Sequence, residues 1–242
     1  MNDDLDQLLT SLKMRRTREV LPRVLERAIR DKPAYDAFLV ELLREEYTYK
    51  RQKSLEYRIE HARIPELFTI ETFPFDQQPS VSAPAIKLLA GLDFISAGFN
   101  LVFIGNAGVG KTGLATGILY KALVNGHRGR FIRAQDLFDE INASLLERSS
   151  RRVLNELCGY TLLCVDELGY LNLKPEQTNI FFKLMEERYA AKKPTIITTN
   201  LDFEQWYDFL GQKAMVQALL DRVRHRCHTI RIDGTTLRSP TG

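Results

Sequence analysis

Eight consecutive residues have the types and spacing needed to bind the phosphates of a nucleotide. The stretch GNAGVGKT, residues 105–112, matches the pattern G-x-x-x-x-G-K-[ST] of a phosphate-binding P-loop. Its glycines allow backbone N–H groups to close around phosphate oxygens. Lys111 would supply a cation to the β- and γ-phosphates, and Thr112 a hydroxyl ligand to Mg²⁺. The sequence predicts an ATP and Mg²⁺ site whose phosphate-binding part is Gly105, Asn106, Ala107, Gly108, Val109, Gly110, Lys111, Thr112 and Gly113.

Two acids and an amide follow at the ends of later apolar runs. TLLCVDEL, residues 161–168, places Asp166 where it can order Mg²⁺ and Glu167 where it can polarise an attacking water as a general base. KPTIITTN, residues 193–200, ends in Asn200, whose amide can hold that water or the γ-phosphate. A base beside the Mg²⁺ carboxylate favours attack by water over transfer to a small molecule.

A late arginine cluster could complete the site of a neighbouring subunit. In DRVRHR, residues 221–226, the arginines at 222, 224 and 226 occupy alternate positions, so they cannot all face one way on a helix. One of them is a candidate arginine finger, a group that contributes roughly 10³ to 10⁵ in rate. The others would contact DNA or solvent, and the pattern alone does not choose among the three.

The elements that position these residues alternate between strand and helix from residue 99 onward. This order predicts an α/β fold with a parallel sheet covered on both faces. The apolar run FNLVFI, which precedes the P-loop, is typical of a buried parallel strand. Strands are expected at 99–104, 130–133, 161–168, 193–200 and 228–234, and helices at 83–97, 112–125, 134–146, 174–191, 202–211 and 214–226.

The first 70 residues have a different character, because they are helical and charged. Residues 13–30 carry seven basic and two acidic side chains, a local charge of +5 that favours contact with DNA or a partner as much as a solvated face. Residues 34–62 predict one long helix with mixed charges, and its apolar face is Tyr35, Phe38, Leu39, Leu42 and Leu43. The following stretch, 65–81, is too apolar for a free linker, and we expect its phenylalanines to pack on the next domain.

Composition limits the remaining possibilities. The chain has 242 residues, 44% of them hydrophobic, and a net charge of only +3, so a basic surface would need local clustering. No apolar run approaches the roughly 20 residues of a membrane helix. Three cysteines without metal spacing and an acidic start without a signal pattern predict a cytoplasmic protein. HRCH, residues 225–228, lacks the ligand spacing of a zinc site.

Four motifs together resemble the IstB family, the ATP-binding helpers of insertion-sequence transposition and relatives of the DnaC helicase loader. They are GNAGVGKTGLA, CVDELGYLNL, ITTNLDFEQW and LLDRVRHRCHTIRIDG, and the resemblance also covers KRQKSLEYRIEHARIPE and FPFDQQPSV. It implies an AAA+ core with a five-stranded parallel sheet in the order 5-1-4-3-2, no separate lid, and a small helical N-terminal domain. It also places Arg222 on the box VII arginine, the finger acting in trans.

The resemblance further implies a function for each part. Residues 1–66 would contact DNA or a partner and support oligomer assembly, 67–98 would pack on the core as linker and leading helix, and 99–242 would form the ATPase. Such helpers bind double-stranded DNA, form ATP-dependent oligomers and present target DNA to a partner transposase.

Two positions depart from the family pattern. Arg238 stands where relatives end in S-Y-R, an arginine sometimes assigned to nucleotide sensing, but here the triplet is T-L-R. Gly113 replaces a usually larger residue, and Gly113 and Gly117 each disfavour a helix by roughly 1 kcal/mol relative to Ala.

Other functions remain open to test. A helicase loader would share the core but prefer single-stranded DNA. A small-molecule kinase is disfavoured by Asp166, Glu167 and Asn200, and a scaffold that binds nucleotide without hydrolysis would carry the same motifs.

Overall fold

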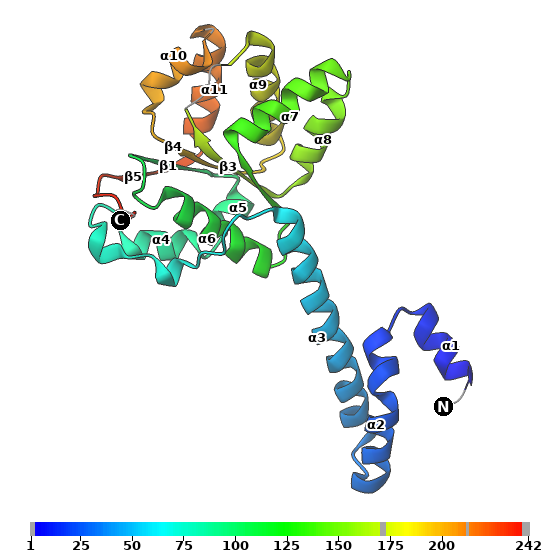
Figure 1. The fold of residues 1–242 in the computed structure, drawn as a ribbon. Helices are drawn as coiled ribbons and strands as arrows, with labels where there is room; N and C mark the ends of the chain where they lie inside the picture. The colour runs from blue at the N-terminus through cyan, green and yellow to red at the C-terminus, as the bar shows by residue number, and fades with distance from the viewer. Residues whose placement is uncertain (1–2, 170–172, 212, 239–242) are drawn as a thin grey trace. The chain divides into compact units, whose positions relative to one another are not determined.

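The chain folds into two compact units, Met1–Tyr57 and Arg58–Gly242. The structure, a computed structural model, describes residues 3–169, 173–211 and 213–238 (Figure 1). The division falls inside helix α3 (Tyr35–Ala62), whose last residues therefore belong to the second unit. In the described ranges, no helix combines the length and apolar character needed to cross a membrane.

The second unit is built on a five-stranded sheet in which every pair of neighbours is parallel. Its strands are β1 (Asn100–Gly105), β2 (Gly129–Arg133), β3 (Leu162–Leu168), β4 (Thr195–Thr199) and β5 (Cys227–Ile232). Their order is β2-β3-β4-β1-β5, which confirms the predicted order. Because β1 lies between β4 and the edge strand β5, the loop that follows it emerges one strand in from the edge of the sheet.

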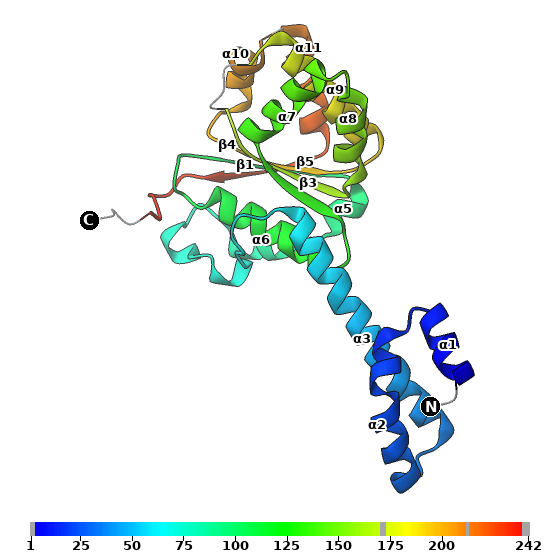
Figure 2. The same cartoon turned by 45° about the vertical axis from the view of Figure 1, so that its right-hand side comes forward.

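Helices cover both faces of this sheet, as Figures 1 and 2 show. One face carries α4 (Ala83–Leu89), α5 (Asp93–Ala97) and α6 (Lys111–Val124). The other carries α7 (Ala134–Leu146), α8 (Ser150–Gly159), α9 (Pro175–Ala190), α10 (Trp206–Leu210), which follows the turn η3 (Phe203–Gln205), and α11 (Lys213–His225). Alternate strand residues point to opposite faces, so Leu101 and Phe103 join one core and Val102 and Ile104 the other.

Two local predictions need correction. The single helix expected at 83–97 is two helices, separated at Leu92, whose φ of 71° is left-handed. Gly91 weakens the helix there, and the turn allows Leu92 and Phe94 to enter the core. The segment after α7, for which no helix was expected, forms helix α8, because Leu154 and Leu157 lie three residues apart and are both buried.

The linker packs on the α6 face of the sheet. It forms two short 3₁₀ turns, η1 (Ile70–Thr72) and η2 (Phe75–Gln77), and buries Ile70. Phe73 and Phe75 pack against this core and each other, with ring centroids 4.9 Å apart, as the aromatic content predicts. Phe68 remains 39% exposed.

The first unit contains α1 (Asp3–Ser11), α2 (Arg15–Asp31) and the first part of α3. Leu9, three α2 residues and Leu42 of α3 form its small core, joined by Phe38. The predicted apolar face of α3 is only partly buried: Leu39 and Leu43 are each 55% exposed and Tyr35 is 90% exposed. The core that α2 and α1 provide is too narrow to cover the whole face.

Candidate nucleotide site

The predicted site residues meet at the carboxyl ends of the parallel strands, where ligands bind in open α/β sheets. The P-loop joins β1 to α6, while Asp166 and Glu167 end β3 and Asn200 follows β4. A cleft of about 1180 Å³ opens there. The predicted residues that line it are Ala107, Gly108, Gly110, Lys111, Thr112, Gly113, Asp166, Glu167 and Asn200.

The P-loop backbone needs its glycines. Gly108 and Gly110 have φ angles of 81° and 94°, in the left-handed region that other residues rarely adopt. Glycine is required at position 105 for a different reason, because a Cβ there would overlap the carbonyl of Ile232 on β5. Val109, in contrast, is buried beneath the loop and anchors it to the core.

The Lys111 side chain is hydrogen-bonded to the backbone of its own P-loop. Its Nζ donates hydrogen bonds to the carbonyl oxygens of Gly105 at 2.9 Å and Asn106 at 2.7 Å. Burial lowers the pKa of the Lys111 ammonium, and the nearby carboxylates of Asp166 and Glu167 oppose that shift. The ammonium therefore sits in a partly desolvated position where a phosphate would interact with it strongly.

The donor set at the end of β3 fits Mg²⁺. The Thr112 hydroxyl donates to the Asp166 carboxylate, with 2.9 Å from Oγ1 to Oδ1. Both groups are hard oxygen ligands of the kind Mg²⁺ prefers. Asp166 is only 3% exposed, and burial raises its pKa, while hydrogen bonds from Thr198 and Thr112 oppose the rise. A buried carboxylate without a basic ion-pair partner in the described chain is a group that a cation would stabilise.

Glu167 and Asn200 supply groups that could act on a water. Glu167 is exposed and lines the cleft, and its φ of 59° is unusual for a residue with a side chain. The Oδ1 atom of Asn200 is buried and accepts no hydrogen bond from any described residue. Buried acceptors of this kind are normally satisfied, so a bound water or ligand donor fits this position.

Arg222 and Arg224 of α11, and Arg226 just after it, lie elsewhere. In the described structure none of them lines the cleft. Arg222 donates to the Ala218 carbonyl and forms a 3.1 Å ion pair with Glu186 of α9. Arg224 and Arg226 lie over the rings of Phe203 and Tyr189. Arg222 thus does not complete the site of its own chain.

The segment after β5 covers the P-loop, although its sequence departs from S-Y-R. The backbone N–H of Leu237 donates to the Gly108 carbonyl at 2.8 Å, and Leu237 and Arg238 line the cleft. A Cβ at Gly108 would overlap the Thr236 hydroxyl. Arg238 therefore lies at the candidate nucleotide cleft, although the sequence left its assignment to nucleotide sensing in doubt. From β5 to residue 238 the described chain forms no further helix.

The linker also enters the site. Phe68, Phe73 and Pro74 line the cleft, and the aromatic residues of the linker were the sequence signal for this contact. A Cβ on Gly113 would lie 3.6 Å from the Phe68 ring, so the departure at position 113 leaves space that the linker occupies. Thr198 on β4 contacts Asp166 and was not singled out, because nothing in its strand distinguishes it from other buried threonines.

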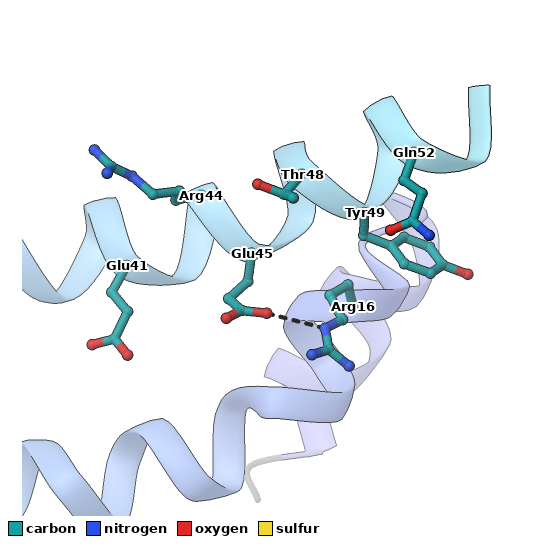
Figure 3. A pocket seen from close by; sticks show the side chains of 7 residues that line it. All are labelled: Arg16, Glu41, Arg44, Glu45, Thr48, Tyr49 and Gln52. Carbon is teal, nitrogen blue, oxygen red and sulfur yellow. Dashed lines mark hydrogen bonds and ion pairs between the residues drawn. The ribbon is translucent and has the colours of Figure 1, made fainter. Parts of the chain in front are cut away.

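Basic and acidic side chains are nearly balanced in the helical unit. Five of the seven basic residues in 13–30 form ion pairs within the unit, with partners Glu19, Glu45, Asp6, Glu41 and Asp31. The whole unit carries 12 basic and 11 acidic residues. A groove of about 480 Å³ lies between α2 and α3, and Arg16 Nε donates a 3.1 Å hydrogen bond to Glu45 there. In Figure 3 the Arg16 guanidinium points toward Glu45, whereas Arg44 points away.

Comparison with known proteins identifies the family of this chain. A family model described as IstB-like ATP binding protein matches residues 7–241. The ATP-binding protein of insertion sequence IS21 from Pseudomonas aeruginosa is 34% identical over 235 residues, covering 97% of this chain and 88% of that protein. That of insertion sequence IS5376 from Geobacillus stearothermophilus is 34% identical over 205 residues, covering 85% of this chain and 81% of that protein.

Solved structures share the fold at lower identity. The crystal structure of DnaI superposes with a TM-score of 0.55 and 23% identity, covering 62% of this chain and 84% of that one. The crystal structure of the DnaC helicase loader superposes with a TM-score of 0.54 and 24% identity, covering 62% of this chain and 87% of that one. These similarities support the fold alone, an AAA+ P-loop domain.

Proposed function

Because the chain belongs to the family of IstB-like ATP-binding proteins, we propose that it hydrolyses ATP with Mg²⁺, assembles on double-stranded DNA and assists a partner transposase. One observation carries the enzymatic part: a single cleft contains Lys111, Thr112, Asp166, Glu167 and Asn200, drawn from three strand ends. The insertion-sequence relatives support the transposition part. The protein would act in the cytoplasm, where it meets DNA and ATP.

Each residue of the cleft has a role that its position supports. Lys111 would bind the β- and γ-phosphates, and Thr112 and Asp166 would hold Mg²⁺, which when bound would supply positive charge next to the phosphates. Glu167 takes a proton from the attacking water. Asn200 orients that water through its unsatisfied Oδ1. The chain's own contribution is thus to position water and phosphate in a partly buried cleft.

Arg222 would complete the site of a neighbouring subunit. Its pair with Glu186 is partly exposed, with side-chain exposures of 39% and 61%, and such pairs contribute about 0–1 kcal/mol. A phosphate could therefore replace Glu186 at little cost. An ATP-dependent oligomer follows, because the nucleotide would then join two copies of the chain.

The helical unit would provide contacts with DNA, transposase or another copy. Leu39, Leu43 and Tyr47 lie four residues apart on α3, and all are more than half exposed. This apolar strip supports a protein contact. DNA contact rests on the family relationship and on the basic residues of 13–30, whose surface ion pairs can exchange for phosphates.

The test is sedimentation of the protein with Mg²⁺-ATP, alone, with a duplex of several tens of base pairs, and with a single strand. A large complex that needs both ATP and duplex is expected. Arg222→Ala should then lose ATPase activity in the assembly, while Arg224→Ala, a neighbouring arginine of the same helix, tests whether position 222 is the finger. A protein that stays monomeric on duplex would contradict the proposal, and assembly on single strands alone would favour a helicase loader.

A further inference from the structure

Thr198, a fully buried residue of β4, connects the two acids that end β3. We propose that its hydroxyl is a positioning group for ATP hydrolysis, which holds the Asp166 carboxylate at the Mg²⁺ site and holds the Glu167 backbone so that its side chain enters the cleft. The inference rests on the proposed ATPase function and extends it to a residue outside the P-loop and the strand-end acids.

The hydrogen bonds of Thr198 have fixed directions. Its Oγ1 donates to Asp166 Oδ1 at 2.6 Å and accepts from the backbone N–H of Glu167 at 2.9 Å. A hydroxyl has one hydrogen and two lone pairs, so a single group can do both. Valine has a similar shape but can do neither, whereas serine can do both.

A β-bulge explains why a side chain must make the second bond. Strands β3 and β4 pair regularly up to Val165↔Ile197, but the next pair is Leu168↔Thr199. Asp166 and Glu167 therefore oppose the single residue Thr198. A bulge leaves its extra residue without a regular ladder partner. The Thr198 hydroxyl occupies that gap and stabilises Glu167 in its left-handed conformation, with φ of 59°.

The hydrogen bond from Thr198 to Asp166 acts on the candidate Mg²⁺ site. Besides Thr198, the described side chain that donates to this carboxylate is Thr112, the predicted Mg²⁺ ligand. The Thr112 hydroxyl would also be a ligand of Mg²⁺, whereas Thr198 would orient Asp166 without being a ligand itself. Substitution of a residue that orients a metal ligand in this way typically lowers metal affinity or activity by about 10- to 100-fold.

Another threonine on the same strand provides a matched control. Thr195 is 1% exposed, and its hydroxyl also accepts one hydrogen bond, from Arg188 Nε at 3.0 Å. It lies three residues before Thr198 and does not line the cleft. Thr195→Val therefore removes a buried hydroxyl from β4 without touching either acid.

The experiment compares Thr198→Val, Thr198→Ser and Thr195→Val in the full chain. Three quantities are measured: kcat and KM for ATP, the melting temperature, and the affinity for a fluorescent ATP analogue in EDTA and in Mg²⁺. For Thr198→Val we expect the affinity for the analogue in EDTA to equal that of the wild type. The gain in affinity on adding Mg²⁺ should be about 10-fold smaller than in the wild type, and kcat should fall by about 10- to 100-fold. Thr198→Ser should stay within about 3-fold of wild type in each, and Thr195→Val should keep its kcat even if its melting temperature falls.

Several results would decide against Thr198. Wild-type Mg²⁺ dependence and kcat in Thr198→Val would overturn the proposal, and so would a kcat loss in Thr195→Val equal to that in Thr198→Val. Thr198→Ala, which adds no atoms, replaces the valine variant if that one does not fold. If the wild type binds Mg²⁺-ATP but does not hydrolyse it, the ATPase function fails, while the Mg²⁺-dependent affinity of the variants still tests whether Thr198 positions Asp166.

Discussion

The described part of each unit contains one buried carboxylate, and the two are stabilised in different ways. Glu46 in the helical unit is 5% exposed and accepts a 2.8 Å hydrogen bond from the backbone N–H of Thr17, in the first turn of α2. Lys50 lies 3.5 Å from its other oxygen. Helix N-termini carry free N–H donors and partial positive charge, so Glu46 caps α2 from another helix.

Asp166 in the α/β unit has neither of these partners. Its hydrogen bonds come from the neutral hydroxyls of Thr112 and Thr198, and it borders an open cleft. The carboxylate of Glu46 thus stabilises the folded chain, whereas the carboxylate of Asp166 has a cost that a bound cation would offset. The comparison separates a carboxylate with partners in the fold from one that a bound cation would stabilise.

The largest effect is expected beside Asp166. Glu167→Gln keeps the size of the side chain but removes the base, so kcat should fall by about 10²- to 10⁴-fold while ATP still binds. The oligomer on duplex DNA should persist, because turnover would no longer release it. ATP turnover and sedimentation measure both effects, and normal turnover would show that Glu167 is not the base.

Gly108→Ala should weaken both the fold and the site. Alanine at a φ of 81° costs about 1–2 kcal/mol, and its Cβ would overlap Thr236 and displace the segment that carries Arg238. Gly126→Ala is the matched control, because φ is 93° there and no atom lies within 4 Å of its Cβ. Both should lose similar stability in denaturant titrations, but only Gly108→Ala should lose ATP affinity, by at least about 10-fold.

Glu46→Ala should lower the free energy of unfolding by about 1–2 kcal/mol, because it leaves the buried N–H of Thr17 without its acceptor. Glu45→Ala is the control on the same helix. Glu45 pairs with Arg16 at a surface position with side-chain exposures of 36% and 39%, so its loss should cost less than about 1 kcal/mol. Equal costs in urea titration would remove the distinction between capping and surface pairing.

In Mg²⁺-free buffer Asp166→Asn should raise the free energy of unfolding, whereas Glu46→Ala should lower it. Burial raises the pKa of Asp166, so its ionised form destabilises the fold as pH rises from the unfolded pKa through the folded pKa. The variant should therefore be more stable than wild type at neutral pH, and this difference should shrink as the pH is lowered. Denaturant titrations across pH without Mg²⁺ measure it, and a variant less stable than wild type would contradict the comparison.

Much of the fold could be predicted because its signals are local. The P-loop glycines, the apolar strands and the acids at the end of β3 are each recognised within a few neighbouring residues. The order of the sheet came from the family resemblance. The break at Leu92 and the helix α8 were missed, since both depend on which apolar residues the core can accept.

The sequence by itself determined the chemistry of the site, because Lys111, Thr112, Asp166, Glu167 and Asn200 carry their functional groups wherever they lie. Only the tertiary structure decided what surrounds them. Hydrogen bonds between distant segments place Thr198 on Asp166 and Leu237 on Gly108, and no periodicity or spacing records such contacts. The physical reason is that strand pairing and packing are set by the whole core, whereas motifs are read from neighbouring residues.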